Sequence, residues 1–203
     1  PNINIFRDPR WGRGHETYGE DPYLTGQLGL NFVKGLQGDH SKYLKTVATA
    51  KHFAVHSGPE ASRHTFDVYP SERDLWETYL PAFRTLVKDA QVSSIMTAYN
   101  RFRGEAASAS DRLYNILRND WGFNGYVVSD CGAISDIWEH HKITSKPSGI
   151  SITLSEWLIQ TFCSSGKPKN NSSVFALIMA LPYSRSLARS TFPPKSFVVS
   201  CIP

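Results

Sequence analysis

The 203-residue sequence has few cysteines and no long apolar run, and each absence excludes a class of protein. The three cysteines, Cys131, Cys163 and Cys201, form an odd set without the short spacing of zinc ligands, so we expect neither a disulfide framework nor a zinc module. No stretch approaches the ~20 consecutive apolar residues of a membrane-spanning helix. We therefore predict no membrane partner.

Acidic residues are scarce in only one part of the chain. Residues 1–143 carry 16 basic and 17 acidic residues, whereas residues 144–203 carry 6 and 1, so the net charge of +4 belongs to the end of the chain. The first part has the mixed charge of an ordinary enzyme surface and gives no reason to expect nucleic acid. A tail that binds anionic partners is an alternative, but its basic residues are scattered and no aromatic platform accompanies them.

Apolar runs with strand character alternate with segments of helical periodicity over residues 1–143. We expect strands at residues 2–6, 46–50, 92–98 and 126–128. We expect helices from Asp21-Pro22 to Gly38, from Ser71 to about Lys88 with a kink at Pro81, from Ser110 or Asp111 to Trp121, and from Ala133 to His141. The first helix should bury the apolar residues Leu24, Leu28, Phe32, Val33 and Leu36.

The alternation of strand and helix predicts an α/β fold with a parallel sheet and helical cover. Four such units make about half of an eight-fold barrel, which needs ~250 residues. We therefore predict a partial (β/α) barrel of the TIM type over residues 1–143, incomplete at both ends.

Polar side chains follow successive predicted strands, at Lys51 and His52, at Tyr99 and Asn100, and at Asp130. A carboxylate between the end of a buried strand and the start of a helix is not placed for packing, because burying an unpaired charge is costly. In parallel barrels the catalytic groups sit at these strand ends. Asp130 is therefore the first catalytic candidate, while a histidine such as His52 is also a common, backbone-bonded core residue.

The loop that follows the first predicted strand, residues 7–22, is dense in arginine, glycine and aromatic residues. A guanidinium offers five donors in a planar fork, which suits carboxylates or neighbouring hydroxyl groups. A loop that simply holds itself together by ion pairs is the alternative, and we favour it for most of these charges.

Taken together, these motifs resemble those of glycoside hydrolase family 3, the β-glucosidase and β-xylosidase family. The matching pieces occur in order, each at a predicted strand end: Arg7–Arg13 with Gly19–Pro22, Lys51–Phe53, Met96–Asn100 and Gly125–Asp130. The resemblance implies hydrolysis of terminal non-reducing β-D-glucosyl or β-D-xylosyl residues by a retaining mechanism. The substrate would be an oligosaccharide or an aryl or alkyl β-glycoside, with no cofactor and no metal ion, and the location periplasmic or secreted.

The resemblance also implies roles for individual residues. Asp130 would be the nucleophile, kept ionised by neighbouring cations. Arg13, Lys51 and His52 would grip the hydroxyl groups of the terminal sugar. Met96 and Tyr99 would line the pocket, although Met96 is nearly as well explained as a core residue, and Tyr99 could bond Asp130.

The chain departs from the family pattern in ways that bear on activity. The general acid of β-glucosidase-like members is a glutamate of a second domain, which this chain lacks, so we expect the fragment to be inactive alone. A truncated, non-catalytic carbohydrate-binding or non-functional product is the alternative. One branch of the family, the β-N-acetylhexosaminidases, uses a histidine as acid and base; His64 stands at about the right place, but its partner aspartate would be Ser62 here.

The last predicted segment, residues 144–203, changes in character. It holds 13 serines against 10 in residues 1–143, and it shows no strand-helix alternation. We interpret it as an irregular or disordered tail unrelated to the family, arising from a shifted reading frame, an unspliced intron or an assembly error. A flexible native tail is the alternative.

Overall fold

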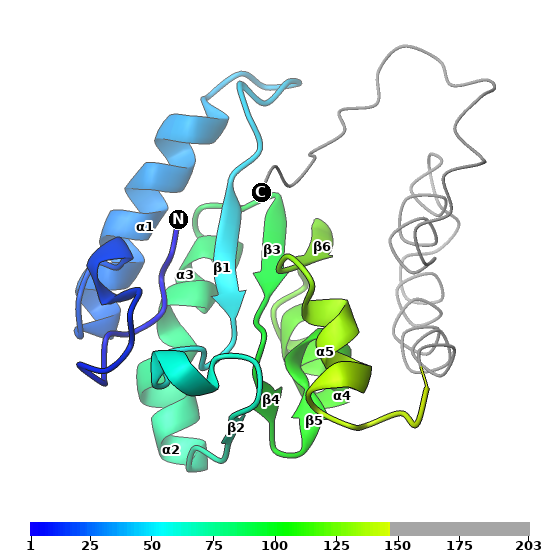
Figure 1. Ribbon diagram of the computed structural model, residues 1–203. Coiled ribbons are helices and arrows are strands. Elements are labelled where there is room, and N and C mark those ends of the chain that lie inside the picture. Colours follow the sequence, from blue (N-terminus) through cyan, green and yellow to red (C-terminus); the bar gives the residue numbers. More distant parts are fainter. Residues whose placement is uncertain (147–203) are drawn as a thin grey trace, which may run out of the picture.

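The computed structural model describes residues 1–146, which fold around a parallel three-stranded sheet. Its strands are β1 (Thr49–Phe53), β3 (Ser94–Thr97) and β6 (Tyr126–Ser129), in the order β1-β3-β6. Figure 1 shows helices packed along this sheet, with α1 and α3 beside β1. The α/β class predicted from the alternation is thus confirmed.

Two of the predicted strands differ from the observed ones. The strand expected at residues 46–50 lies at Thr49–Phe53, so Lys51 and His52 belong to the strand and do not follow it. The strand expected at residues 2–6 makes only one parallel bridge, Asn2 to Lys51, in which the Ile3 N–H donates to the Lys51 carbonyl at 2.9 Å. The chain therefore continues the sheet beyond β1 by a single ladder contact.

A second, smaller sheet was not predicted from the sequence. It consists of β2 (Asp67–Val68), β4 (Arg101–Phe102) and β5 (Glu105–Ala106), with β2 parallel and β5 antiparallel to β4. Strands of two residues are too short to give a period-two pattern, so alternation could not reveal them. Figure 1 places this sheet beyond the carboxyl ends of β1 and β3.

The predicted helices are present, one with a π-helical turn in its middle and one with a π-helical turn at its C-terminal end. Their bounds are α1 Pro22–Gln37, α2 Glu72–Asp74, η3 Leu75–Tyr79, α3 Pro81–Lys88, α4 Asp111–Asn115, η5 Ile116–Asp120 and α5 Ala133–Glu139. The short 3-10 turns are η1 Gly14–Glu16, η2 Glu60–Ser62 and η4 Ala107–Ala109. Helix α3 starts at Pro81, because proline lacks the N–H that would continue the preceding helix and fits its first turn.

The predicted buried face of α1 is right at Val33 and wrong at Leu24, Leu28 and Phe32. Leu24, Leu28 and Phe32 are 43–49% exposed, whereas the buried positions are Thr25, Gly26, Gly29, Val33 and Gln37. The buried glycines allow close approach: a Cβ on Gly29 would lie 3.0 Å from a Leu86 methyl of α3 and 3.1 Å from Ile3. Helix α1 thus faces its neighbours with small residues, which a hydrophobicity pattern does not detect.

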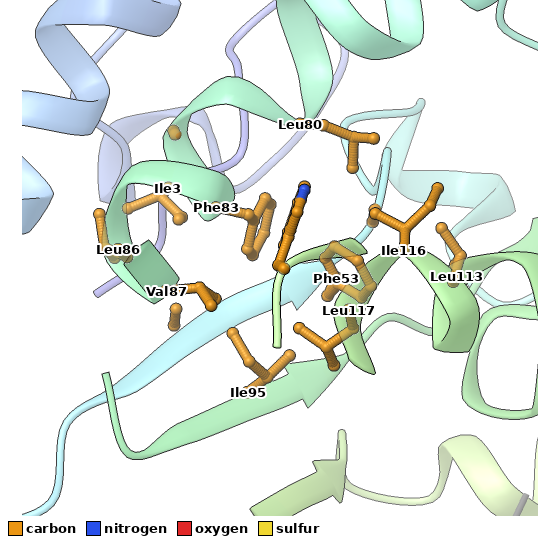
Figure 2. Packing of buried hydrophobic residues seen from close by; sticks show 14 of the residues in the cluster. Ile3, Phe53, Leu80, Phe83, Leu86, Val87, Ile95, Leu113, Ile116 and Leu117 are labelled. Carbon is orange, nitrogen blue, oxygen red and sulfur yellow. The ribbon is translucent and has the colours of Figure 1, made fainter. Parts of the chain in front are cut away.

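The hydrophobic core lies between the sheet and the helices α3, α4 and η5, as Figure 2 shows. Phe53 at the end of β1 packs edge-on against Phe83 and Trp121, with ring centroids 5.1 and 5.9 Å apart, geometries that aromatic pairs favour. The predicted inward residues Leu113, Ile116, Leu117 and Trp121 are all buried. This packing fixes the end of β1, from which His52 projects.

The two faces of the parallel sheet differ in cover. Ala50 and Ile95 are register partners on the helix-covered face and are fully buried. Lys51, Met96 and Val128 are register partners on the other face, and each remains partly exposed. Side chains alternate along a strand, so Asp130, two residues beyond Val128, continues this second face. The less covered face is therefore the one that carries the polar candidates.

The described residues show a parallel sheet with helical cover but not a closed barrel. The predicted tail, residues 144–203, lies outside the described residues apart from positions 144–146. Within residues 1–146, the helices are too short or too polar to cross a bilayer.

Candidate active site

Asp130 lies between the end of β6 and the start of α5. One oxygen of its carboxylate accepts a hydrogen bond from the backbone, and the other does not. Its backbone N–H donates to the Thr97 carbonyl at 3.3 Å, which extends the β3-β6 ladder by one bond. Its side-chain Oδ1 accepts the Cys131 N–H at 2.8 Å. The residue is only 8% exposed, yet Oδ2 has no hydrogen-bond partner among residues 1–146. A buried carboxylate oxygen without a donor is costly unless a ligand supplies one.

His52 is aimed at Asp130 by a break in the sheet. The pairing of β1 with β3 shifts register between Lys51 and Phe53, and such bulges redirect side chains at active sites. The Nε2 atom of His52 lies 3.2 Å from Asp130 Oδ2. The strand end thus brings an imidazole and a carboxylate together across β3.

Asn4 determines which nitrogen of His52 carries the proton. Its Nδ2 donates to the His52 carbonyl at 2.8 Å, and its Oδ1 accepts the His52 backbone N–H at 2.8 Å, so the amide orientation is fixed. The same Oδ1 lies 3.1 Å from His52 Nδ1. An oxygen acceptor at that position requires a proton on Nδ1, which leaves Nε2 of the neutral ring as an acceptor.

His52 is held in its neutral form. Burial is the largest cause that lowers its pKa, and the nearby groups His56, Arg13 and Lys51 lower it further. The Nε2 lone pair is used by Arg13, whose Nη1 lies 3.1 Å away and donates to it. The His52–Asp130 contact is therefore not an ion pair: two lone-pair atoms face each other, which explains why Oδ2 receives no hydrogen from the ring.

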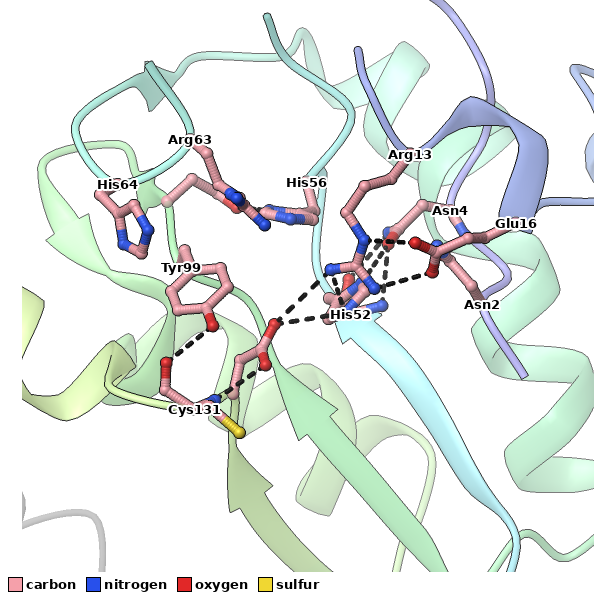
Figure 3. A network of polar contacts seen from close by, with 12 residues as sticks. Asn2, Asn4, Arg13, Glu16, His52, His56, Arg63, His64, Tyr99 and Cys131 are labelled. Atoms are coloured by element: carbon pink, nitrogen blue, oxygen red, sulfur yellow. Dashed lines mark hydrogen bonds and ion pairs between the residues drawn. The ribbon is translucent and has the colours of Figure 1, made fainter. Parts of the chain in front are cut away.

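Arg13 is the cation of this cluster, and Glu16 orients it. The guanidinium donates from Nε and Nη2 to the two Glu16 oxygens, both at 2.7 Å, in the bidentate geometry that fixes a guanidinium plane. Its Nη1 is left to face His52 and lies 4.0 Å from Asp130 Oδ2. The paired Arg13 lowers the pKa of Glu16 to about 2, by its hydrogen bonds first. Figure 3 shows this chain of contacts.

Tyr99 contacts the residue after Asp130. Its hydroxyl donates to the Cys131 carbonyl at 2.7 Å, so the expected bond to the Asp130 carboxylate is replaced by a bond to the neighbouring backbone. Burial first, and the Asp130 carboxylate second, raise the pKa of Tyr99, so the phenol stays protonated as a donor. The ring stands beside the carboxylate and fixes the turn that carries it.

Lys51 and Met96 lie in one row of the sheet. They are register partners on β1 and β3, both partly exposed, on the face that Asp130 continues. The charge of Lys51 is near enough to contribute to lowering the pKa of Glu16, after the larger effect of Arg13. The structure thus brings Asp130, His52 and Arg13 into contact and sets Lys51 and Met96 on the adjoining sheet surface.

His56 is a site residue that the sequence reasoning did not single out. Its ring lies 4.8 Å from that of His52 and 5.9 Å from that of Tyr99, centroid to centroid. Asn100 accepts from Nδ1 at 3.3 Å, while the buried Nε2 has no hydrogen-bond partner among the described residues. Burial lowers the pKa of His56 to about 4. The motif signal was weak, because His56 lies in a loop of mixed composition.

His64 has an acidic partner from an unexpected place. Its Nδ1 lies 2.8 Å from Asp136 Oδ2, a carboxylate of α5 that is 72 residues away along the chain. The expected partner position, Ser62, instead bonds the Pro59 carbonyl. The His64 ring packs 4.5 Å from that of Tyr99, centroid to centroid. The acid role of His64 remains a prediction.

Comparison with known families decides the assignment. The model of the glycosyl hydrolase family 3 N-terminal domain matches residues 1–154, most of the chain. The chain belongs to glycosyl hydrolase family 3. The resemblance drawn from the strand-end motifs is therefore confirmed.

The curated relatives of this family 3 chain include xylosidases. A xylan 1,4-beta-xylosidase of Xylanibacter ruminicola is 60% identical over 148 residues, which cover 71% of this chain and 17% of the relative. The exo-1,4-beta-xylosidase bxlB of Emericella nidulans is 43% identical over 175 residues, covering 78% and 23%. The chain thus spans about a fifth of the length of the relatives it matches.

Solved family 3 structures share the fold. A GH3 exo-beta-xylosidase, XlnD, in complex with a xylobiose aziridine activity-based probe superposes with a TM-score of 0.71 at 38% identity, covering 75% of this chain and 21% of that chain. A beta-glucosidase from Listeria innocua in complex with glucose gives a TM-score of 0.71 at 30% identity, covering 89% and 27%. Both xylose- and glucose-cleaving names therefore occur among its structural neighbours.

Proposed function

We propose that this chain carries the nucleophile and part of the sugar-binding site of a retaining exo-β-glycosidase. The observation that carries the proposal is the buried Asp130 carboxylate, whose Oδ2 has no donor among residues 1–146 while His52 and Arg13 stand 3.2 and 4.0 Å from it. An oxygen in that position is free to attack a carbon atom of a ligand.

In the proposed reaction, Asp130 Oδ2 attacks the anomeric carbon as the glycosidic bond breaks. The leaving oxygen takes a proton from a general acid, and the sugar becomes an ester of Asp130. Water then adds to the anomeric carbon, gives its proton to the same acid residue, and releases the sugar with retained configuration. Retaining enzymes hold their two carboxyl groups ~5–5.5 Å apart, so the acid must approach the open side of Asp130.

In this proposal, each residue around Asp130 has its own role in binding the sugar. Arg13 presents Nη1 as a charged donor, and His52 Nε2 is an acceptor that a sugar hydroxyl can bond in place of the guanidinium. Lys51 adds a second cation on the same sheet face as Met96. Tyr99 holds the Cys131 carbonyl and thereby the turn of the nucleophile. Bonds to the hydroxyl next to the reacting carbon strengthen in the transition state.

A terminal β-D-xylosyl residue is the substrate that we favour, with β-D-glucosyl second, as part of an oligosaccharide or an aryl or alkyl β-glycoside. Three relatives with 60%, 43% and 43% identity are named xylosidases, one of them a beta-xylosidase/alpha-L-arabinofuranosidase. Cys131 directly after the nucleophile, in place of a tryptophan, agrees with the xylosidase side of the family.

We also propose that the described sheet is part of a (β/α) barrel. Two features support this: the parallel register of β1, β3 and β6, and the parallel bridge of the N-terminal segment to β1. Tyr126 of β6 is 46% exposed on the less covered face of the sheet, where further strands of a barrel would cover it.

The fragment is proposed to lack full turnover because the general acid comes from another part of the whole enzyme. A leaving group that is stable as an anion departs without a proton from a general acid. A substrate with such a leaving group therefore tests the nucleophile alone. With dinitrophenyl β-xyloside the folded chain should release a burst of about one dinitrophenol per chain. Methyl β-xyloside should give none.

The test compares Asp130→Asn with Asp120→Asn, an exposed aspartate outside the site, after circular dichroism confirms that each is folded. The burst should vanish in the first variant and persist in the second. A folded wild-type chain that gives no burst with either the xyloside or the matching glucoside would refute the proposal, and so would a burst that survives Asp130→Asn.

A further inference from the structure

A second cluster of ligand-type side chains lies outside the Asp130 site. His64 comes from the loop before β2, Asp136 from α5, and His140 from the end of that helix. One potential ligand atom from each of the three lies within 4.8 Å of the others. Asp136 and His140 are four positions apart on one helix, whereas His64 lies 72 residues before Asp136, so the packing of α5 against the loop brings His64 to the other two.

We propose that His64, Asp136 and His140 bind a divalent transition-metal ion of the Zn²⁺ class. The ligand atoms are His64 Nδ1, a carboxylate oxygen of Asp136 and His140 Nε2. Two imidazoles and one carboxylate are a donor set that zinc and its neighbours in the first transition row accept.

The distance from His140 to Asp136 suits an ion better than a hydrogen bond, whereas the distance from His64 to Asp136 is that of a hydrogen bond. His140 Nε2 stands 3.6 Å from Asp136 Oδ1, which is too long for a hydrogen bond. It is close to the ~3.3 Å between two ligands that are each ~2.1 Å from a tetrahedral zinc ion. His64 Nδ1 is 2.8 Å from Asp136 Oδ2 and must move outward by about half an ångström to admit the ion. Its side chain is 40% exposed, so there is room for that shift.

Burial and exposure are distributed as an exchangeable metal site requires. The Asp136 side chain is only 5% exposed, so an unneutralised carboxylate there is costly. The two histidine side chains are 40% and 43% exposed, which leaves the remaining coordination positions to water. A site of three protein ligands with open positions binds and releases its ion more readily than a closed four-ligand site.

The ion would join two segments that border the proposed sugar site. The ring of His64 itself packs 4.5 Å from the ring of Tyr99, centroid to centroid. Helix α5, which carries Asp136, begins directly after the turn of Asp130 and Cys131. Binding should therefore stabilise this wall of the site. The inference does not depend on the proposed glycosidase function, because it is tested by metal binding alone.

The experiment titrates the 203-residue chain with Co²⁺ and Zn²⁺. Co²⁺ should give a visible absorption band with a stoichiometry of one ion per chain, and Zn²⁺ should abolish it by displacement. Calorimetry should show that His64→Gln, His140→Gln and Asp136→Asn each weaken Zn²⁺ binding by at least tenfold. Each variant's circular dichroism should match the wild type, which separates lost ligands from lost fold.

Two control variants remove metal-binding side chains elsewhere. His15→Gln removes an exposed histidine, and Cys131→Ser removes an exposed thiol. Both should bind Zn²⁺ as the wild type does. The proposal is overturned if the folded wild-type chain binds no ion, if the three ligand variants bind as tightly as the wild type, or if affinity is lost only with Cys131→Ser.

Discussion

Two histidine-aspartate pairs flank Tyr99; the aspartate is buried in both, and they differ in whether the histidine is buried. In the first, the His52 side chain is 1% exposed and its Nε2 lies 3.2 Å from Asp130 Oδ2. In the second, the His64 side chain is 40% exposed and contacts Asp136 at 2.8 Å. The first pair leaves a carboxylate oxygen open to a ligand, whereas in the second each carboxylate oxygen faces an imidazole, at 2.8 Å for His64 and 3.6 Å for His140. The same two residue types thus support different chemistry.

The difference arises from the residues around each pair. Asn4 fixes the proton of His52 on the far nitrogen, and Arg13 occupies the near one. Within residues 1–146, the His64 ring has no asparagine or arginine partner like those of the His52 ring. Substitutions of the residues around the His52–Asp130 pair should therefore have the largest effects.

Arg13→Leu should slow covalent labelling by an activated fluoroxyloside about 100-fold, because a charged donor beside the nucleophile is lost. Arg73→Leu is the matched control, since Arg73 also pairs with a nearby glutamate, Glu77, at 2.9 Å and its side chain is 82% exposed. Its labelling rate should change by less than about threefold. Equal losses in both variants would show that Arg13 acts only through general charge.

Asn4→Ala should lower the free energy of unfolding by about 3 kcal/mol, because the backbone N–H and C=O of buried His52 lose their partner. Asn31→Ala removes an exposed asparagine that bonds one helix carbonyl, and should cost less than about 0.5 kcal/mol. Urea unfolding of the two variants measures both values. Similar small losses would contradict the support assigned to Asn4.

His56 should make the fold sensitive to acid. Its pKa is lowered from 6.5 to about 4, so the unfolded chain takes up a proton as the pH falls below 6.5 while the folded chain does not until about 4. The contribution of His56 to the free energy of unfolding should decline in that window by up to about 1.4 kcal/mol per pH unit and stay constant above it. His56→Asn should reduce the slope, leaving the share of His52, and an unchanged slope would contradict the neutral, buried state of His56.

Tyr99→Phe should have the smallest effect, a loss of about 1 kcal/mol in stability and less than tenfold in labelling, because one hydrogen bond to the Cys131 carbonyl disappears. Tyr69→Phe is the control, as Tyr69 is 70% exposed and bonds Asp67 on the surface. Thermal unfolding and labelling rates check both. A loss of 100-fold or more would mean that the phenol contacts the sugar directly.

The sequence was informative wherever a motif lay at a strand end. Asp130, His52 and Arg13 were singled out from short motifs, and the fold brings them within 4.0 Å of one another. The roles that the motifs imply are still proposals. Local reasoning succeeded because parallel strands deliver their carboxyl ends to one edge.

Reasoning from the sequence failed where packing partners are distant or small. The buried face of α1 is set by Gly26 and Gly29, which no hydrophobic pattern marks. The register shift after Lys51 moved the strand boundary and turned His52 toward Asp130. Asp136 is 72 residues from His64, so their contact depends on the docking of α5.

The assignment of Asp130 as the nucleophile is tested most directly by mapping the site of covalent labelling with a fluoroxyloside that bears a dinitrophenyl leaving group. Mass spectrometry of the digested chain should place the trapped sugar on the peptide that contains Asp130, with no label in Asp130→Asn and normal label in Asp120→Asn. A label on the peptide segment of Asp136, or one that persists in Asp130→Asn, would contradict it.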